Sequence, residues 1–125
     1  MKHKFLFLLT VIIQLCSACS SSANKQVSID PVKTSPGIFK ILLENEHVRV
    51  VQYSLQPGEK DGWHTHPAKS SYVVSGGKLK VHLKNGEIIL ADEKEGTASW
   101  MDYVGEHFVE NIGNTAVTIV FTEIK

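Results

Sequence analysis

The hydrophobic pattern along this chain alternates over short distances, as it does in β-strands with one buried face. Leu79, Val81 and Leu83 are separated by polar residues, which predicts a half-exposed strand. Other runs are rich in β-branched and aromatic residues, with Pro-Gly, Gly-Gly and Asn-Gly pairs between them. The predicted strands cover residues 48–55, 71–74, 79–83, 87–91 and 116–124. No helix is predicted after Ile38, so the pattern indicates an all-β antiparallel sandwich or barrel.

Two details of this pattern predict how the strands are arranged. Residues 48–55 and 116–124 carry apolar side chains on both faces, which is typical of central strands. Lys84-Asn85-Gly86 lies between two alternating runs. Because both central residues of a type I′ turn need a positive φ, Asn85-Gly86 predicts a two-residue hairpin of that type.

The first residues follow a different pattern. Lys2 and Lys4 precede an uncharged apolar run over residues 5–15, which is too short to span a membrane and predicts a signal peptide over residues 1–18. The segment Cys16-Ser17-Ala18-Cys19 resembles the cleavage box of bacterial lipoproteins, although Cys16 stands where Leu is usual. The resemblance implies lipid attachment at Cys19, export to the periplasm and a membrane anchor made by lipid alone. A plain secreted protein is the alternative.

Composition limits what the rest of the chain can be. The 125 residues allow one domain, which we place at residues 38–125 after a polar tether and lead-in at 19–37. Lys+Arg and Asp+Glu both number 13, so charge gives no reason to expect a nucleic-acid partner. After removal of residues 1–18, Cys19 is the only cysteine, so the domain has no internal disulfide.

The segment around His64 and His66 is the first candidate for chemistry. Residues two apart in a strand share a face, so these two imidazoles can reach one metal ion. Gly58, Gly62 and Pro67 flank the pair and define its backbone. By itself the pair also fits two half-exposed polar residues on an edge strand.

Together with a second segment, residues 96–111, the His64/His66 segment resembles the two sequence motifs of the cupin family. The first cupin motif is G-x5-H-x-H-x3,4-E-x6-G and the second is G-x5-P-x-G-x2-H-x3-N. The matching residues are Gly58, His64, His66 and Gly77 in the first motif, and Gly96, His107 and Asn111 in the second. The resemblance covers about residues 43–125. It implies a double-stranded β-helix (a jelly-roll barrel) in a single domain, with His64, His66 and His107 as ligands of a divalent transition metal.

The sequence departs from both cupin motifs. Lys69, Ser70 or Ser71 occupies the place of the acidic ligand, and Asp102 and Val104 replace the Pro and Gly of the second motif. Three neutral imidazoles leave the metal its double charge and an open position, which attracts anionic or chelating small molecules. They do not discriminate among Fe, Zn, Ni, Cu and Mn. Since imidazoles bind metal only when neutral, release is predicted below about pH 6.

Three functions remain open at this point. The first is a metal-dependent enzyme, since cupins with three histidine ligands include dioxygenases that use ferrous iron and oxygen to cleave cysteine or diketones. Isomerase or lyase chemistry would fit the same metal site. The alternatives are a non-catalytic periplasmic module that binds or senses a small ligand, and a metal-free scaffold. The sequence identifies no general base, and the fourth metal ligand could be one of the replacing residues or water. Cupins commonly pair through sheet edges, so a homodimer is a possible state.

Other polar residues are predicted to lie away from the site. His82 should face solvent and His47 should lie in a surface turn. Alternation points Glu106 and Glu110 away from the face of His107, and Asp102 is expected to cap a turn. Large side chains of a small barrel more often fill its core than line a pocket. That expectation applies to Trp63, Tyr72, Trp100, Met101 and Tyr103.

Overall fold

The computed structural model describes residues 25–125, which form one short helix followed by antiparallel strands. The helix is α1 (Pro31–Thr34). The strands are β1 (Phe39–Glu44), β2 (Val48–Leu55), β3 (His64–His66), β4 (Lys69–Ser75), β5 (Gly77–Leu83), β6 (Ile88–Glu93), β7 (Ala98–Met101), β8 (Val104–Asn111) and β9 (Val117–Ile124). The five strands predicted from the sequence are all present, with ends that differ by a few residues.

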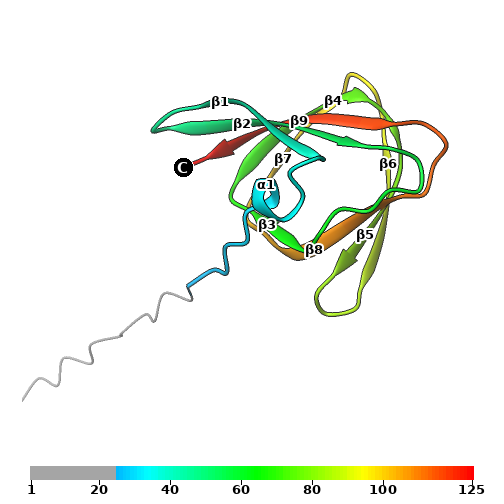
Figure 1. Ribbon diagram of the computed structural model, residues 1–125, viewed down its shortest axis with the longest axis horizontal. Coiled ribbons are helices and arrows are strands. Elements are labelled where there is room, and N and C mark those ends of the chain that lie inside the picture. Colours follow the sequence, from blue (N-terminus) through cyan, green and yellow to red (C-terminus); the bar gives the residue numbers. More distant parts are fainter. Residues whose placement is uncertain (1–24) are drawn as a thin grey trace, which may run out of the picture.

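The strands form two sheets that face each other around a common interior (Figure 1). One sheet has the order β1-β2-β9-β4-β7 and the other has the order β3-β8-β5-β6. Strands β2 and β9 have neighbours on both sides, which confirms that residues 48–55 and 116–124 are central. This arrangement turns one face of every strand toward the interior.

Alternation along β2 and β9 builds the core. Their inward side chains are Val51, Tyr53, Leu55, Val117, Ile119 and Phe121, all of them buried. Burial of such apolar surface stabilises the fold by about 25 cal/mol for each Å². The inward row of β9 continues to Glu123, which is 1% exposed. A carboxylate is therefore buried at the end of an apolar row.

The hairpin between β5 and β6 is present, but its turn differs from the prediction. Gly86 has a φ of 88°, while no residue other than glycine among residues 25–125 has a positive φ, so Asn85 cannot occupy a type I′ turn. The Leu83 carbonyl accepts from Gly86 N at 3.0 Å and Leu83 N donates to the Glu87 carbonyl at 2.9 Å. The loop is a three-residue one with a type I turn and a left-handed glycine. Asn85 Oδ1 also accepts from Glu87 N, a local bond that stabilises this conformation.

Residues that precede the barrel cover the outer side of β3. Asp30 caps α1 by accepting from Val32 N, and Pro31 occupies the first turn, where its missing N–H costs nothing. Ile29 exchanges hydrogen bonds with Thr65, whose side chain points away from the interior. Because Thr65 is held on the outside, His64 and His66 are turned inward.

Two of the sequence predictions fall on other parts of the chain. The signal peptide at residues 1–18 and the lipid attachment at Cys19 lie outside the described residues. Within residues 25–125, no helix combines the length and the apolar character that a membrane span requires.

Candidate metal centre

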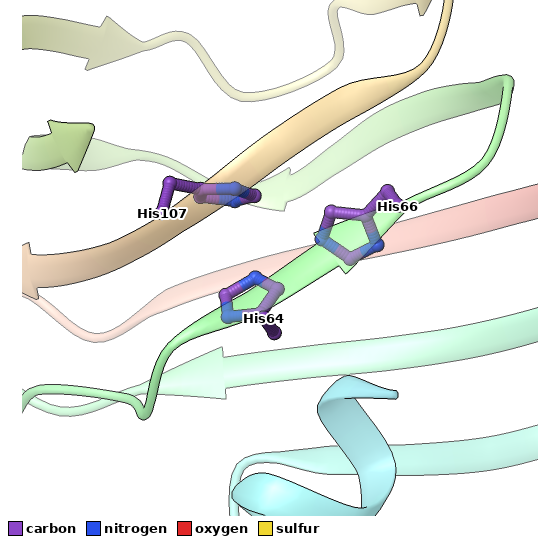
Figure 2. A group of neighbouring side chains, drawn as sticks. All are labelled: His64, His66 and His107. Carbon is purple, nitrogen blue, oxygen red and sulfur yellow. The ribbon is translucent and has the colours of Figure 1, made fainter. Parts of the chain in front are cut away.

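Strands β3 and β8 bring the three predicted histidines together (Figure 2). His64 pairs directly with His107, and their ring centroids lie 4.2 Å apart. The His66 ring lies 4.8 Å from that of His64 and 5.5 Å from that of His107. All three side chains are buried, and one nitrogen of each lies within 4.8 Å of the others. The three imidazoles therefore surround a common point inside the barrel.

A bulge in β8 sets the register of this cluster. His66 pairs with Val104 and His64 pairs with His107, so β8 contains one more residue than β3 between these two pairs. Beyond the bulge, regular alternation resumes. The inward positions are His107, Val109 and Asn111. Glu106 and Glu110 occupy the outward positions, as predicted, and neither carboxylate lines the interior.

Each imidazole is oriented by a bond at its Nδ1 atom. The acceptors are the Gly62 carbonyl for His64, the Gly105 carbonyl for His107 and Glu123 Oε1 for His66, each at 2.7 Å. A neutral ring that donates from Nδ1 keeps the lone pair of Nε2 for a metal. Neutral imidazole nitrogens are common ligands of such metals, and here one nitrogen of each ring lies within 4.8 Å of the others. The donor set therefore fits a divalent transition metal.

The carboxylate behind His66 is a functional residue that the sequence analysis missed. Glu123 accepts from His66 through one oxygen and from Arg49 Nε through the other, at 2.7 Å each. Arg49 also donates to Asp30 at 3.0 Å, which links the cluster to the lead-in. Glu123 could have been noticed as the one charged residue in the alternating inward row of residues 117–123.

A cavity of about 230 Å³ adjoins the three histidines. Its wall is mostly apolar, with side chains from both sheets, and its polar members besides the histidines include Lys69 and Ser71. Ser70 points outward and is exposed, because alternation along β4 turns only Lys69 and Ser71 inward. Lys69 and Ser71 are thus the inward-facing residues at the place of the missing acidic ligand.

Four further polar residues line the cavity and were not predicted, namely Tyr53, Asp61, Glu93 and Ser99. Asp61 Oδ1 accepts from Val109 N at 2.6 Å, but Asp61 Oδ2 has no hydrogen-bond partner among the described residues. The buried Tyr53 hydroxyl also lacks a well-aligned hydrogen bond among the described residues, and burial and the nearby Asp61 carboxylate raise its pKa. Nothing in the local sequence marks either residue, since only the fold places them beside the cluster. They offer hydrogen-bonding capacity to a molecule in the cavity.

Comparison with known proteins identifies the architecture. No protein-family model and no curated protein sequence matches this chain. A solved cupin domain from Bordetella pertussis Tohama I matches with a TM-score of 0.65 and 27% identity, covering 70% of this chain and 92% of that one. An RmlC-like cupin family protein with a double-stranded β-helix fold, from Methanocaldococcus jannaschii, matches with a TM-score of 0.57 and 18% identity. The match covers 70% of this chain and 78% of that one. The chain has the cupin fold.

A third solved structure is described as a predicted oxalate decarboxylase from Thermotoga maritima. It matches at a TM-score of 0.50 and 26% identity, covering 69% of this chain and 77% of that one. The double-stranded β-helix in a single domain that the sequence predicted is confirmed. The comparisons and the geometry together support metal binding by the cupin barrel and leave the identity of the metal open.

Burial shifts the pKa values of the ionisable groups in the cupin barrel. Burial, together with neighbouring positive charge that includes Lys69, lowers the pKa of His64 to about 3 and that of His66 to about 2. The pKa of His107 is lowered for the same reasons. Burial raises the pKa of the Asp61 carboxyl to about 7. The His64 and His66 imidazoles are therefore neutral, and able to bind metal, well below the pH at which free histidine becomes protonated, and the pKa of His107 is shifted in the same direction.

We expect the metal-free protein to lose stability as the pH falls from about 6.5 toward 4. In this range the unfolded chain protonates the imidazoles of His64 and His66, which stay neutral in the fold, and the lowered pKa of His107 acts in the same direction. Among residues 25–125, Asp61 is the carboxyl whose raised pKa opposes this by taking up a proton earlier in the fold. The unfolded state thus binds more protons, which costs about 1–3 kcal/mol for each pH unit. Thermal melts of chelator-treated protein at pH 7, 5.5 and 4.5 measure this. A melting temperature that rises on acidification would contradict it.

The same pKa values change the expected pH of metal release. The sequence alone predicts release below about pH 6, because free imidazoles become protonated there. Since His64 and His66 stay neutral in the fold, protons compete weakly for them. Metal is therefore expected to remain bound after dialysis at pH 5, which elemental analysis can check.

The remaining histidines lie outside the cluster. His47 has an exposed side chain, as predicted. His82 lies on the outer face of its strand, also as predicted, but only 21% of its side chain is exposed. The Phe108 ring stacks on it at 4.2 Å and covers it. Neither residue reaches the metal centre.

The prediction that the large side chains fill the core is wrong for most of them. Trp63, Tyr72 and Trp100 are 40–58% exposed and do not line the cavity. Met101, also exposed, does line it. The reason is strand parity, which turns these three aromatic side chains outward. Asp102 is exposed too, and it accepts from Trp100 Nε1 rather than approaching the histidines.

Proposed function

We propose that the protein binds a divalent transition metal through His64, His66 and His107 and acts on a small molecule in the adjoining cavity. The observation that carries this proposal is the meeting of three buried rings, each with its Nδ1 atom in a hydrogen bond and one nitrogen of each within 4.8 Å of the others. A bound metal would supply Lewis acidity and, as ferrous iron with oxygen, redox chemistry.

The protein's own residues would hold and surround the small molecule. The polar atoms of Asp61 and Tyr53 can exchange hydrogen bonds with it. The apolar part of the wall keeps competing water out and strengthens those bonds. A solved structure that is similar to this chain is described as a predicted oxalate decarboxylase, which supports an enzyme of small molecules here.

We further propose that the protein is exported and anchored to the membrane by lipid on Cys19. The support comes from the sequence, in which two lysines and an apolar run precede the lipoprotein-like segment at residues 16–19. A periplasmic position would expose the cavity to small molecules that enter from outside the cell.

Metal analysis followed by turnover assays tests the function. The mature domain as isolated is expected to contain about one transition metal ion per chain. After anaerobic loading with ferrous iron, oxygen consumption is measured with thiols, diketones and flavonols, and the His107→Ala variant serves as the control. Faster oxygen consumption than in the variant supports an enzyme. Metal without turnover indicates a binding or sensing module, and failure to bind any metal would leave a scaffold.

A further inference from the structure

Lys69 places an ammonium group inside the barrel. It occupies the first position of β4, where alternation turns its side chain toward the cavity, and the residue is only 4% exposed. The Nζ atom lies over the Phe121 ring, 3.4 Å from its centroid. Lysine is among the residues least often buried without a partner, so this position needs an explanation.

No protein anion neutralises this ammonium. Among residues 25–125, no carboxylate lies within 4.0 Å of Lys69 Nζ. Glu123 and Glu93 are near enough to favour the charge, but neither forms an ion pair with it. Glu123 is already bonded to Arg49 and His66, and Glu93 lines the same cavity. Burial lowers the pKa of Lys69 to about 8, so the side chain still carries its charge at neutral pH. The Phe121 ring offsets only part of the cost of desolvation.

The ammonium and the histidine cluster border the same cavity. The Phe121 ring lies under Lys69 Nζ and also 5.3 Å from the His66 ring, so one aromatic side chain connects the two positions. Apolar side chains, including Leu79, Val81 and Ile119, line the cavity elsewhere. The wall also includes the carboxyl groups of Asp61 and Glu93, so a negative group is favoured only beside Lys69 and the histidines, with an apolar remainder against the apolar side chains.

We infer that the cavity binds a small carboxylate with an apolar body, whose carboxylate group lies between Lys69 and the three-histidine centre. The inference rests on the proposed function, because it gives one carboxylate oxygen to the metal and the other to the ammonium. A phosphate or sulfate group fits less well, since the cavity offers one cationic side chain rather than several donors in a cluster. Lys69 would then determine the charge of the molecule that is accepted.

Binding of butyrate and butyramide to the zinc-loaded protein tests the inference. The two probes share a hydrocarbon chain and differ in charge. Isothermal titration should show that butyrate binds and that butyramide binds at least about tenfold more weakly, as expected for loss of a hydrogen bond between charged groups. In Lys69→Met, butyrate should lose at least about tenfold in affinity. Lys78→Met, at an exposed lysine of β5, should bind butyrate as the wild type does.

Two further measurements distinguish a failure of the proposed metal site from a failure of the inferred carboxylate site. Zinc titration of Lys69→Met should give the wild-type stoichiometry, and a wild-type protein that binds no zinc would contradict the proposed function itself. Without any ligand, Lys69→Met should melt at a higher temperature than the wild type, because a neutral chain replaces an unpaired buried charge. Equal affinity for the two probes would overturn the inference, as would an unchanged butyrate affinity or a lower melting temperature in Lys69→Met.

Discussion

Replacing His107 by alanine is expected to abolish the stabilisation that a transition metal confers on this protein. The ring lies 4.2 Å from that of His64 and supplies the only ligand from β8, so its loss leaves two imidazoles from a single strand. A metal present at a hundred times its dissociation constant stabilises the folded state by about 2.7 kcal/mol. For a domain of this size that corresponds to a rise in melting temperature of about 10–20 °C.

The measurement is the difference in melting temperature with and without zinc, for wild type, His64→Ala and His107→Ala. Using this difference removes any effect of the substitutions on the metal-free fold. His47→Ala is the matched control, because its side chain is exposed and lies outside the cluster. If His107→Ala gains as much from zinc as the wild type does, the three histidines do not form the metal centre.

Replacing Glu123 by glutamine is expected to weaken both the fold and the metal site. Its carboxylate is almost fully buried between His66 and Arg49, at 2.7 Å from each. Removing one partner of a buried ion pair costs about 3–5 kcal/mol, because the other charge remains without compensation. Loss of the group that orients a ligating histidine lowers metal affinity by about 10- to 100-fold. Urea denaturation and zinc titration measure the two effects.

A double variant separates the contribution of the Arg49–Glu123 ion pair to stability from the role of Glu123 in orienting the His66 ring. Arg49→Met together with Glu123→Gln removes both charges, so the double variant should lose less stability than the sum of the two single variants. Its zinc affinity should stay as low as in Glu123→Gln, since His66 still lacks its carboxylate. Glu46→Gln, at an exposed carboxylate, should change neither quantity. Unchanged zinc affinity in Glu123→Gln would show that this residue has no role at the site.

Much of the fold follows from the local pattern of this sequence. Alternation identified the strand around Val81, and runs of β-branched and aromatic residues identified those around Val51 and Ile119. The spacing of His64 and His66 correctly put both rings on one face. Strands β1, β3, β7 and β8 are not among the five predicted strands. In β1 and β7 nearly all side chains are exposed, so burial imposes no alternating pattern on them. The turn at Asn85 was predicted with the wrong type, since its side chain bonds locally to Glu87.

The candidate site could be predicted only in part, because most of the residues around the three histidines come from other segments of the chain. Glu123 is 57 residues from His66, yet its carboxylate bonds to that ring. Asp61 and Tyr53 meet the same cavity from a loop and a central strand, and no local pattern marks either of them. The sequence left three residues in place of the missing acid, and the structure turns Lys69 and Ser71 inward.

The sequence by itself determined the β class of the fold, the common face of His64 and His66 and the three imidazoles able to bind a metal. These are consequences of a backbone period of two residues and of side-chain chemistry, both of which are local. Only the tertiary structure decided which inward residues meet, that Glu123 orients His66 and that Lys69 is left without a partner. Such contacts depend on strand register and on the closure of two sheets around one interior, which bring together residues far apart in the chain.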